Sequence, residues 1–161
     1  IEIAWSPHSN WILFIKELKN QFQGMSFGAA SLTEASSLEL ISELEFSFAM
    51  SPYWDLEFQS KARDLNQLVV PGVYSPSEIQ QAINFGHRVV KIFPASLLGK
   101  NYIHQIKESM QPLPFFIAAG GIKIKDINSW LSNGYGAIVI GRDLINNSQI
   151  DPSLEKWING E

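Results

Sequence analysis

The chain contains no cysteine among its 161 residues, which excludes disulfide bonds, thiolate metal sites and thiol nucleophiles. No apolar run approaches the roughly 18–20 residues that a membrane-spanning helix needs, so no membrane association is expected. A basic stripe is also missing and the net charge is −4, which makes nucleic acid an unexpected partner. The three histidines show no ligand-like spacing with acidic residues, so we expect no metal site. We therefore expect a soluble cytoplasmic protein.

The composition is that of one globular domain. Apolar residues make up 45% and charged residues 17%, and the length fits a single domain over residues 1–161. The chain opens directly on Ile1-Glu2-Ile3-Ala4-Trp5, a strand-like segment without an initiator methionine. From this start we expect an N-terminally incomplete domain.

Short apolar runs alternate with amphipathic segments along the whole chain. Strands are expected at 1–5, 25–30, 46–50, 68–70, 89–93, 115–118 and 137–140. Helices are expected at 8–22, 33–44, 56–64, 77–85, 101–110, 125–132 and 153–158. In the first helix, Trp11, Leu13, Phe14, Leu18 and Phe22 should form one stripe against the sheet. The sequence Ser75-Pro76-Ser77-Glu78 predicts a capped helix start.

Strands spaced about 20 to 25 residues apart predict the βα repeat of a parallel sheet. Seven strands would leave a (β/α)₈ TIM barrel one unit short, so we expect the first βα unit to lie upstream of Ile1. An open doubly wound sheet is the alternative fold. That fold normally carries a glycine-rich turn after its first strand, whereas Trp5-Ser6-Pro7-His8 has no glycine. The sequence therefore favours the barrel.

Lys91 lies within the apolar run Val89-Val90-Lys91-Ile92-Phe93. Such continuous runs are typical of strands that are covered on both faces. An ammonium group buried there tends to lose its proton, and the neutral amine is a nucleophile toward ketones. The structural alternative is a lysine whose stem packs in the wall while its head reaches solvent. Both interpretations remain open on this residue alone.

Polar groups at two other strand positions are further candidates, because barrel enzymes place their chemistry at the carboxyl ends of strands. Glu2, between Ile1 and Ile3, would have a raised pKa in apolar surroundings and could shuttle protons, unless it is an exposed terminus. Ser31 could bind substrate, although Ser31 and Glu34 also fit a helix capping box.

Glycine-containing turns follow several strands. Pro71-Gly72 would shape a pocket. Gly120-Gly121 and Gly141-Arg142 follow the last two strands, where backbone amides, a following helix start and a guanidinium group favour an anion. Glycine turns are common, so this signal is weak when taken alone.

The segment Val90-Lys91-Ile92-Phe93-Pro94-Ala95-Ser96, with Leu98-Gly99, Pro112-Leu113-Pro114 and Gly120-Gly121, resembles the 2-keto-3-deoxy-6-phosphogluconate / 4-hydroxy-2-oxoglutarate aldolases. These are class I, Schiff-base aldolases on a (β/α)₈ barrel, usually homotrimers. The resemblance extends over nearly the whole chain. The family also has one βα unit ahead of the glutamate strand.

The resemblance implies roles for particular residues. Lys91 would form the Schiff base and Glu2 would be the catalytic glutamate. The implied substrate-binding residues are Ser31, Pro71, Gly72, Phe93 and Ala119. The implied phosphate-binding residues are Gly120, Gly121, Gly141 and Arg142.

Four positions depart from the family pattern. The family usually has arginine at Ser6, threonine at Ala119 and glycine at Ile140, and Arg142 stands where its G-G-S loop has serine. The residues that the resemblance assigns to the covalent chemistry are kept, whereas residues that would hold the substrate are altered.

The expected activity is cleavage of a 2-keto-4-hydroxy acid to pyruvate and an aldehyde, without a metal or organic cofactor. The alternatives are a degenerate aldolase that binds a keto acid or phosphate ligand without turnover, and a non-covalent phosphate-binding barrel. A purely structural module gives no reason for a lysine inside a strand.

Overall fold

The structure, a computed structural model, describes residues 1–146 and 149–160. The chain divides into two compact units, Ile1–Gly72 and Val73–Glu161. Each unit holds strands of one four-stranded sheet. No helix within the described residues is long and apolar enough to cross a membrane.

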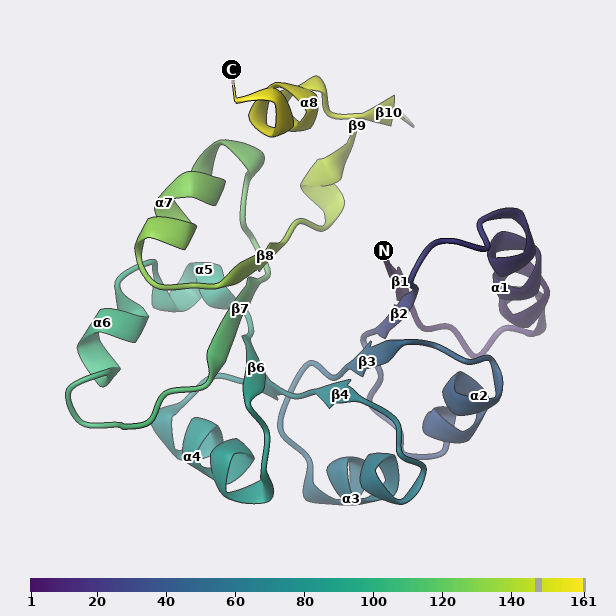
Figure 1. Ribbon diagram of the computed structural model, residues 1–161, viewed down its shortest axis with the longest axis horizontal. Helices are drawn as coiled ribbons and strands as arrows, with labels where there is room; N and C mark the ends of the chain where they lie inside the picture. The colour runs from purple at the N-terminus through teal and green to yellow at the C-terminus, as the bar shows by residue number, and fades with distance from the viewer. Residues whose placement is uncertain (147–148, 161) are drawn as a thin grey trace. The chain divides into compact units, whose positions relative to one another are not determined.

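The first unit is a βα repeat with a parallel sheet. Its strands are β1 (Glu2–Ala4), β2 (Gly28–Ala30), β3 (Phe48–Met50) and β4 (Val69–Val70), paired in chain order. Its helices are α1 (Ser9–Gln21), α2 (Ser37–Glu43) and α3 (Leu56–Asp64). All three helices lie on the same side of the sheet (Figure 1). Parallel neighbours need such crossover connections, which explains the spacing of the strands in the sequence.

The core of the first unit is aromatic where α1 meets the sheet. The Trp11 ring stacks on Phe46 at 5.7 Å between centroids and meets Trp5 edge-on at 4.9 Å. Ile15 is fully buried beside Trp11. The apolar stripe expected on this helix was partly wrong, because Leu13 and Phe14 are 66% and 50% exposed. They point away from the face that Trp11 and Ile15 bury.

The second unit repeats the same pattern. Its sheet contains β5 (Gly72–Val73), β6 (Val89–Ile92), β7 (Phe115–Ala119) and β8 (Ala137–Val139), again in chain order. Its helices are α4 (Pro76–Phe85), α5 (Ala95–Leu98), α6 (Tyr102–Ile106) and α7 (Ile127–Ser132). After β8 come the 3₁₀ turn η2 (Arg142–Leu144), strands β9 (Ile145–Asn146) and β10 (Gln149–Ile150), and α8 (Pro152–Asn159) (Figure 1).

Most expected elements are present, and the differences have local causes. The expected strand at 68–70 is followed, after Pro71, by the separate strand β5, since proline has no N–H to give to a sheet ladder. The antiparallel pair β9–β10 was not expected. The Ser75 capping box is confirmed: the Glu78 amide donates to the Ser75 hydroxyl, and the Ser75 amide donates to the Glu78 carboxylate.

The capping role considered for Ser31 was wrong. Helix α2 begins only at Ser37, so Ser31 lies in the loop before it. The Ser31 backbone is left-handed, with φ of 62°, and its side chain is exposed. The loop is instead closed by the Ser37 hydroxyl, which donates to the Glu34 carbonyl at 2.6 Å.

Candidate active site

Lys91 is held inside strand β6, as the sequence predicted. Its residue is 5% exposed, and its neighbours Val90 and Ile92 are fully buried. In the sheet, Lys91 lies beside Ile117 of β7. The interpretation of Lys91 as a lysine with a solvent-exposed head is therefore wrong.

The aromatic ring of Phe93 is one neighbour of the Lys91 amine. Lys91 Nζ lies 5.4 Å from the Phe93 ring centroid. Phe93 itself is fixed at the end of β6, where its amide donates to the Val73 carbonyl at 3.1 Å. Burial disfavours the ammonium form of the amine, whereas the ring face favours it.

The turn after β7 packs directly on this ring. A Cβ on Gly120 would lie 3.0 Å from two Phe93 ring carbons and 3.1 Å from Pro94 Cα, and the Gly120 φ is +91°. Both the space and the backbone conformation therefore require glycine. Ala119, just before the turn, is 4% exposed and ends β7. The structure thus brings Lys91, Phe93 and Gly120 together at the carboxyl ends of β6 and β7.

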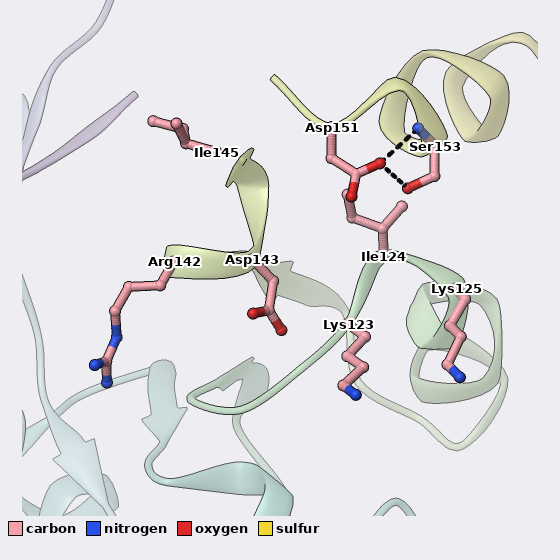
Figure 2. A pocket seen from close by; sticks show the side chains of 8 residues that line it. All are labelled: Lys123, Ile124, Lys125, Arg142, Asp143, Ile145, Asp151 and Ser153. Atoms are coloured by element: carbon pink, nitrogen blue, oxygen red, sulfur yellow. Dashed lines mark hydrogen bonds between the residues drawn. The ribbon is translucent and has the colours of Figure 1, made fainter. Parts of the chain in front are cut away.

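The loops after β7 and β8 border one pocket of about 700 Å³. Its lining residues are Lys123, Ile124, Lys125, Arg142, Asp143, Ile145, Asp151 and Ser153 (Figure 2). Figure 2 shows the Arg142 side chain extending away from Lys123 and Lys125. The pocket therefore offers cationic groups on separate walls rather than one convergent cluster.

The helix starts expected to favour an anion are short. Gly141 is followed by the single 3₁₀ turn η2, and Gly120-Gly121 by the 3₁₀ turn η1 (Ile124–Asp126) and the six-residue α7. Helical turns do follow both glycine turns, but they sum few peptide dipoles, and their contribution to holding an anion stays a prediction. What remains is the exposed backbone of Gly121 and Gly141.

Sequence reasoning missed Lys123 and Lys125 as pocket residues. The available signal was their position immediately after Gly120-Gly121-Ile122. In barrels, the residues that follow a strand lie at its carboxyl end, where the site is built. A second pocket of about 470 Å³ lies at the opposite, amino ends of β6 and β7, bordered by His87, Arg88 and Pro114 among others. Within residues 1–146 and 149–160, no group of three acidic or histidine side chains is placed to hold a metal ion.

The other candidates belong to the first unit. Glu2 is half-buried on β1 and lies beside Gly28 of β2. Pro71 and Gly72 are buried after β4. The Gly72 amide donates to the Ser51 hydroxyl at 3.3 Å, and that hydroxyl donates to the Tyr53 carbonyl at 2.9 Å. A Cβ on Gly72 would overlap the Pro52 carbonyl. This packing ties the loop after β3 to the strand junction.

The perturbed titratable groups of the second unit have structural partners. The Tyr102 hydroxyl donates to the Tyr74 carbonyl at 3.1 Å, and burial, with Glu78 nearby, raises the pKa of Tyr102. Burial, with a smaller contribution from Tyr102, raises the pKa of Tyr135 to about 12. Tyr135 also meets Trp130 edge-on at 5.0 Å. These tyrosines stabilise the packing around α6 and α7.

Several curated proteins are similar in sequence. A 2-dehydro-3-deoxy-6-phosphogalactonate aldolase of Escherichia coli is 24% identical over 117 residues, which are 73% of this chain and 57% of that protein. A 2-dehydro-3-deoxy-phosphogluconate aldolase of Pseudoalteromonas atlantica is 28% identical over 120 residues, 73% of this chain and 55% of that protein. The chain thus spans a little over half the length of the curated relatives it matches.

Solved structures share the fold. A KDPGal structure superposes with a TM-score of 0.81 at 22% identity, over 96% of this chain and 75% of that one. A KDPG aldolase of Legionella pneumophila, with pyruvate captured as a covalent carbinolamine, superposes with a TM-score of 0.75 at 22% identity, over 85% of this chain and 66% of that one.

The family assignment rests on the match along the chain rather than on any single motif. The family model described as KDPG and KHG aldolase matches residues 2–157, which is nearly the whole sequence. The chain belongs to the KDPG and KHG aldolase family.

Proposed function

We propose that this protein is a class I aldolase that cleaves a 2-keto-4-hydroxy acid to pyruvate and an aldehyde through a Schiff base on Lys91. The observation that carries the proposal is the burial of Lys91, 5% exposed, beside Phe93 and the Gly120 turn. A desolvated amine next to a turn with exposed amides is what a covalent keto-acid site requires. The pyruvate carbinolamine of the Legionella relative supports the same chemistry.

In the proposed reaction, neutral Lys91 Nζ adds to the C2 carbonyl of the substrate and gives a carbinolamine. Loss of water leaves a protonated Schiff base. Glu2, through a water molecule, removes the proton of the C4 hydroxyl as the C3–C4 bond breaks, and the bonding electrons move to the iminium nitrogen to form an enamine. The aldehyde leaves, C3 takes up a proton, and addition of water at C2 releases pyruvate and restores the amine.

The remaining assignments follow the family resemblance. Ser31, Pro71, Gly72, Phe93 and Ala119 contact the keto acid in this proposal. The aldehyde end, where phosphorylated, rests on the amides of Gly120-Gly121 and Gly141-Arg142. A complete (β/α)₈ barrel, a homotrimer and a cytoplasmic location also remain predictions.

Borohydride reduction in the presence of pyruvate tests the covalent step. Peptide mass spectrometry should find a reduced pyruvate adduct on Lys91, and Lys91→Arg should abolish both the adduct and pyruvate release. An adduct-free native protein would contradict the proposal. Activity retained in Lys91→Met would point instead to a non-covalent phosphate-binding enzyme.

A degenerate aldolase is the second candidate. Ala119 presents a buried methyl group, and Arg142 extends away from the other cationic residues of the pocket (Figure 2). Both positions could weaken the hold on the substrate. A Lys91 adduct with pyruvate but no aldol cleavage, measured as pyruvate release from a panel of 2-keto-4-hydroxy acids, would favour this candidate.

A further inference from the structure

The loop that follows the lysine strand is tied to the Gly120-Gly121 turn. Ser96 lies in α5, three residues beyond Phe93, and its amide donates to the Gly120 carbonyl at 3.2 Å. This hydrogen bond fixes the Ser96 backbone against a turn that follows the next strand of the sheet. Gly120 therefore contacts both Phe93, through packing on its ring, and Ser96, through this hydrogen bond.

The Ser96 side chain occupies the space above Gly121. A Cβ on Gly121 would overlap Ser96 Oγ and would lie 2.9 Å from Ser96 Cβ. Gly121 also has a φ of +73°, a left-handed conformation that favours glycine. The hydroxyl of Ser96 thus lies directly on the glycine turn.

The Ser96 hydroxyl is available to a ligand. Ser96 is exposed, and within the described part of the chain its hydroxyl takes part in no hydrogen bond. Some serine hydroxyls of the second unit are engaged instead, such as that of Ser109 with the Ile106 carbonyl at 3.1 Å and that of Ser153 with Asp151 at 2.6 Å.

The turn itself has no polar side chain. Residues 118–122 are Ala-Ala-Gly-Gly-Ile, so they offer only backbone groups to a bound molecule. An anion resting on those amides needs further donors to replace its hydration. Ser96 places a hydroxyl donor at that turn.

We propose that the Ser96 hydroxyl donates a hydrogen bond to the phosphate group of a phosphorylated substrate bound at the Gly120-Gly121 turn. This inference rests on the proposed aldolase function and names a residue that selects the phosphorylated form of the substrate. Ser96 takes no part in the covalent chemistry. It contributes to binding at the end of the substrate remote from Lys91.

The test compares 2-keto-3-deoxy-6-phosphogluconate with its non-phosphorylated analogue 2-keto-3-deoxygluconate. Ser96→Ala should raise KM for the phosphorylated substrate roughly tenfold, as expected for losing a hydrogen bond to a charged group, with kcat nearly unchanged. KM for the analogue should stay the same. Ser96→Thr, which keeps the hydroxyl, should restore most of the affinity. Leu97→Ala is the matched control, because Leu97 is the adjacent residue of α5 and is 74% exposed.

Equal changes in KM for both substrates, or no change for either, would overturn the assignment of Ser96. Binding of inorganic phosphate, followed by titration calorimetry, supplies a readout that does not need turnover. It should weaken roughly tenfold in Ser96→Ala, and unchanged binding would overturn the inference. A native protein that forms no Lys91 adduct but binds phosphate through Ser96 would refute the proposed function alone.

Discussion

The Lys91 amine and the Phe93 ring form a contact of 5.4 Å between Nζ and the ring centroid. Phe93 lies just beyond the end of β6, in the turn that follows the strand, and its ring lies within reach of the amine. The ring face attracts an ammonium group and not a neutral amine. Phe93 therefore favours the charged form of the residue proposed to act as the nucleophile.

The first prediction concerns this contact. Phe93→Leu removes the ring face but keeps an apolar side chain, so the neutral amine should form more readily. The rate of pyruvate trapping by borohydride should then reach its half-maximal value at a lower pH than in the native protein. Phe115→Leu, at the opposite end of the neighbouring strand, is the control and should leave the profile unchanged. A shift to higher pH would contradict the role given to the ring.

The second prediction concerns Gly72, whose missing Cβ lets the loop after β3 pack closely. In Gly72→Ala the new methyl group would overlap the Pro52 carbonyl, and backbone cannot rotate away as a side chain can. The variant should lose about 1–3 kcal/mol of unfolding free energy, the usual effect of overpacking. Gly24→Ala in the same unit is the control, because nothing lies within 4 Å of its Cβ position. Urea denaturation of both variants measures the difference, and equal losses would argue against the packing contact.

The third prediction concerns the helix start at Ser75. Ser75→Ala should lower the unfolding free energy by roughly 1 kcal/mol, because the Glu78 amide loses its acceptor. Ser77→Ala, two residues along the same helix and exposed, should change stability little. Thermal denaturation of the two variants checks this, and an equal shift in both would show that the cap has no special role.

Glu78 adds a pH dependence to the same cap. Burial tends to raise the pKa of Glu78, but hydrogen bonds from the amides of Ser75 and Tyr74 and from the Ser75 hydroxyl outweigh it, so the pKa lies below the usual 4.5. Because the pKa is lowered, the carboxylate stabilises the folded state at pH values above the usual pKa. This contribution disappears as the pH falls through the folded-state pKa. The stability difference between the native protein and Glu78→Gln should therefore be largest near neutral pH and shrink in acid. A difference that grows in acid would contradict this assignment.

The fourth prediction concerns Tyr135. Its pKa of about 12 lies above the usual 10 because the ring is buried. A phenol whose pKa is raised in the folded state stabilises the fold at pH values below the usual pKa. This contribution is lost as the pH rises through the folded-state pKa. The native protein should lose stability between pH 10 and 12 more steeply than Tyr135→Phe. Denaturation series at alkaline pH measure the slopes, and parallel curves would show that Tyr135 does not titrate with unfolding.

The fifth prediction concerns Gln59 on α3, which is 1% exposed. Neither its side-chain oxygen nor its nitrogen has a hydrogen-bond partner within the described residues. Burial of this amide costs desolvation free energy that no hydrogen bond offsets. Gln59→Leu should therefore raise the unfolding free energy by on the order of 1 kcal/mol.

Gln67→Leu is the matched control for Gln59. The Gln67 amide donates to the Phe46 carbonyl at 3.2 Å, so its removal should destabilise the protein. Chemical denaturation compares the two variants. A loss of stability in Gln59→Leu equal to that in Gln67→Leu would show that Gln59 is satisfied by a partner such as an ordered water.

Local chemistry made the elements predictable. The helix at Leu56–Asp64 matches its expected range, and the Ser75 capping box was read from four consecutive residues. Strand β6 follows from a continuous apolar run, and the burial of Lys91 follows from its place inside it. These features depend on neighbours within one or two turns of chain, so the sequence carries them directly.

Contacts between distant segments were beyond such reasoning. Five apolar residues of the helix expected at 8–22 were to face the sheet, yet Leu13, Phe14 and Phe22 are exposed. The angle at which the helix meets the sheet decides which side of a broad stripe is buried. The polar Gln59 is buried on α3 for the same reason.

By itself, the sequence determined the βα repeat, the buried lysine and the turns that follow the last strands. Only the tertiary structure decided that the Phe93 ring lies on Gly120 and that Ser96 covers Gly121. The physical reason is that periodicity and capping act over a few residues, whereas these contacts depend on how β6 and β7 pair and on where their loops then turn.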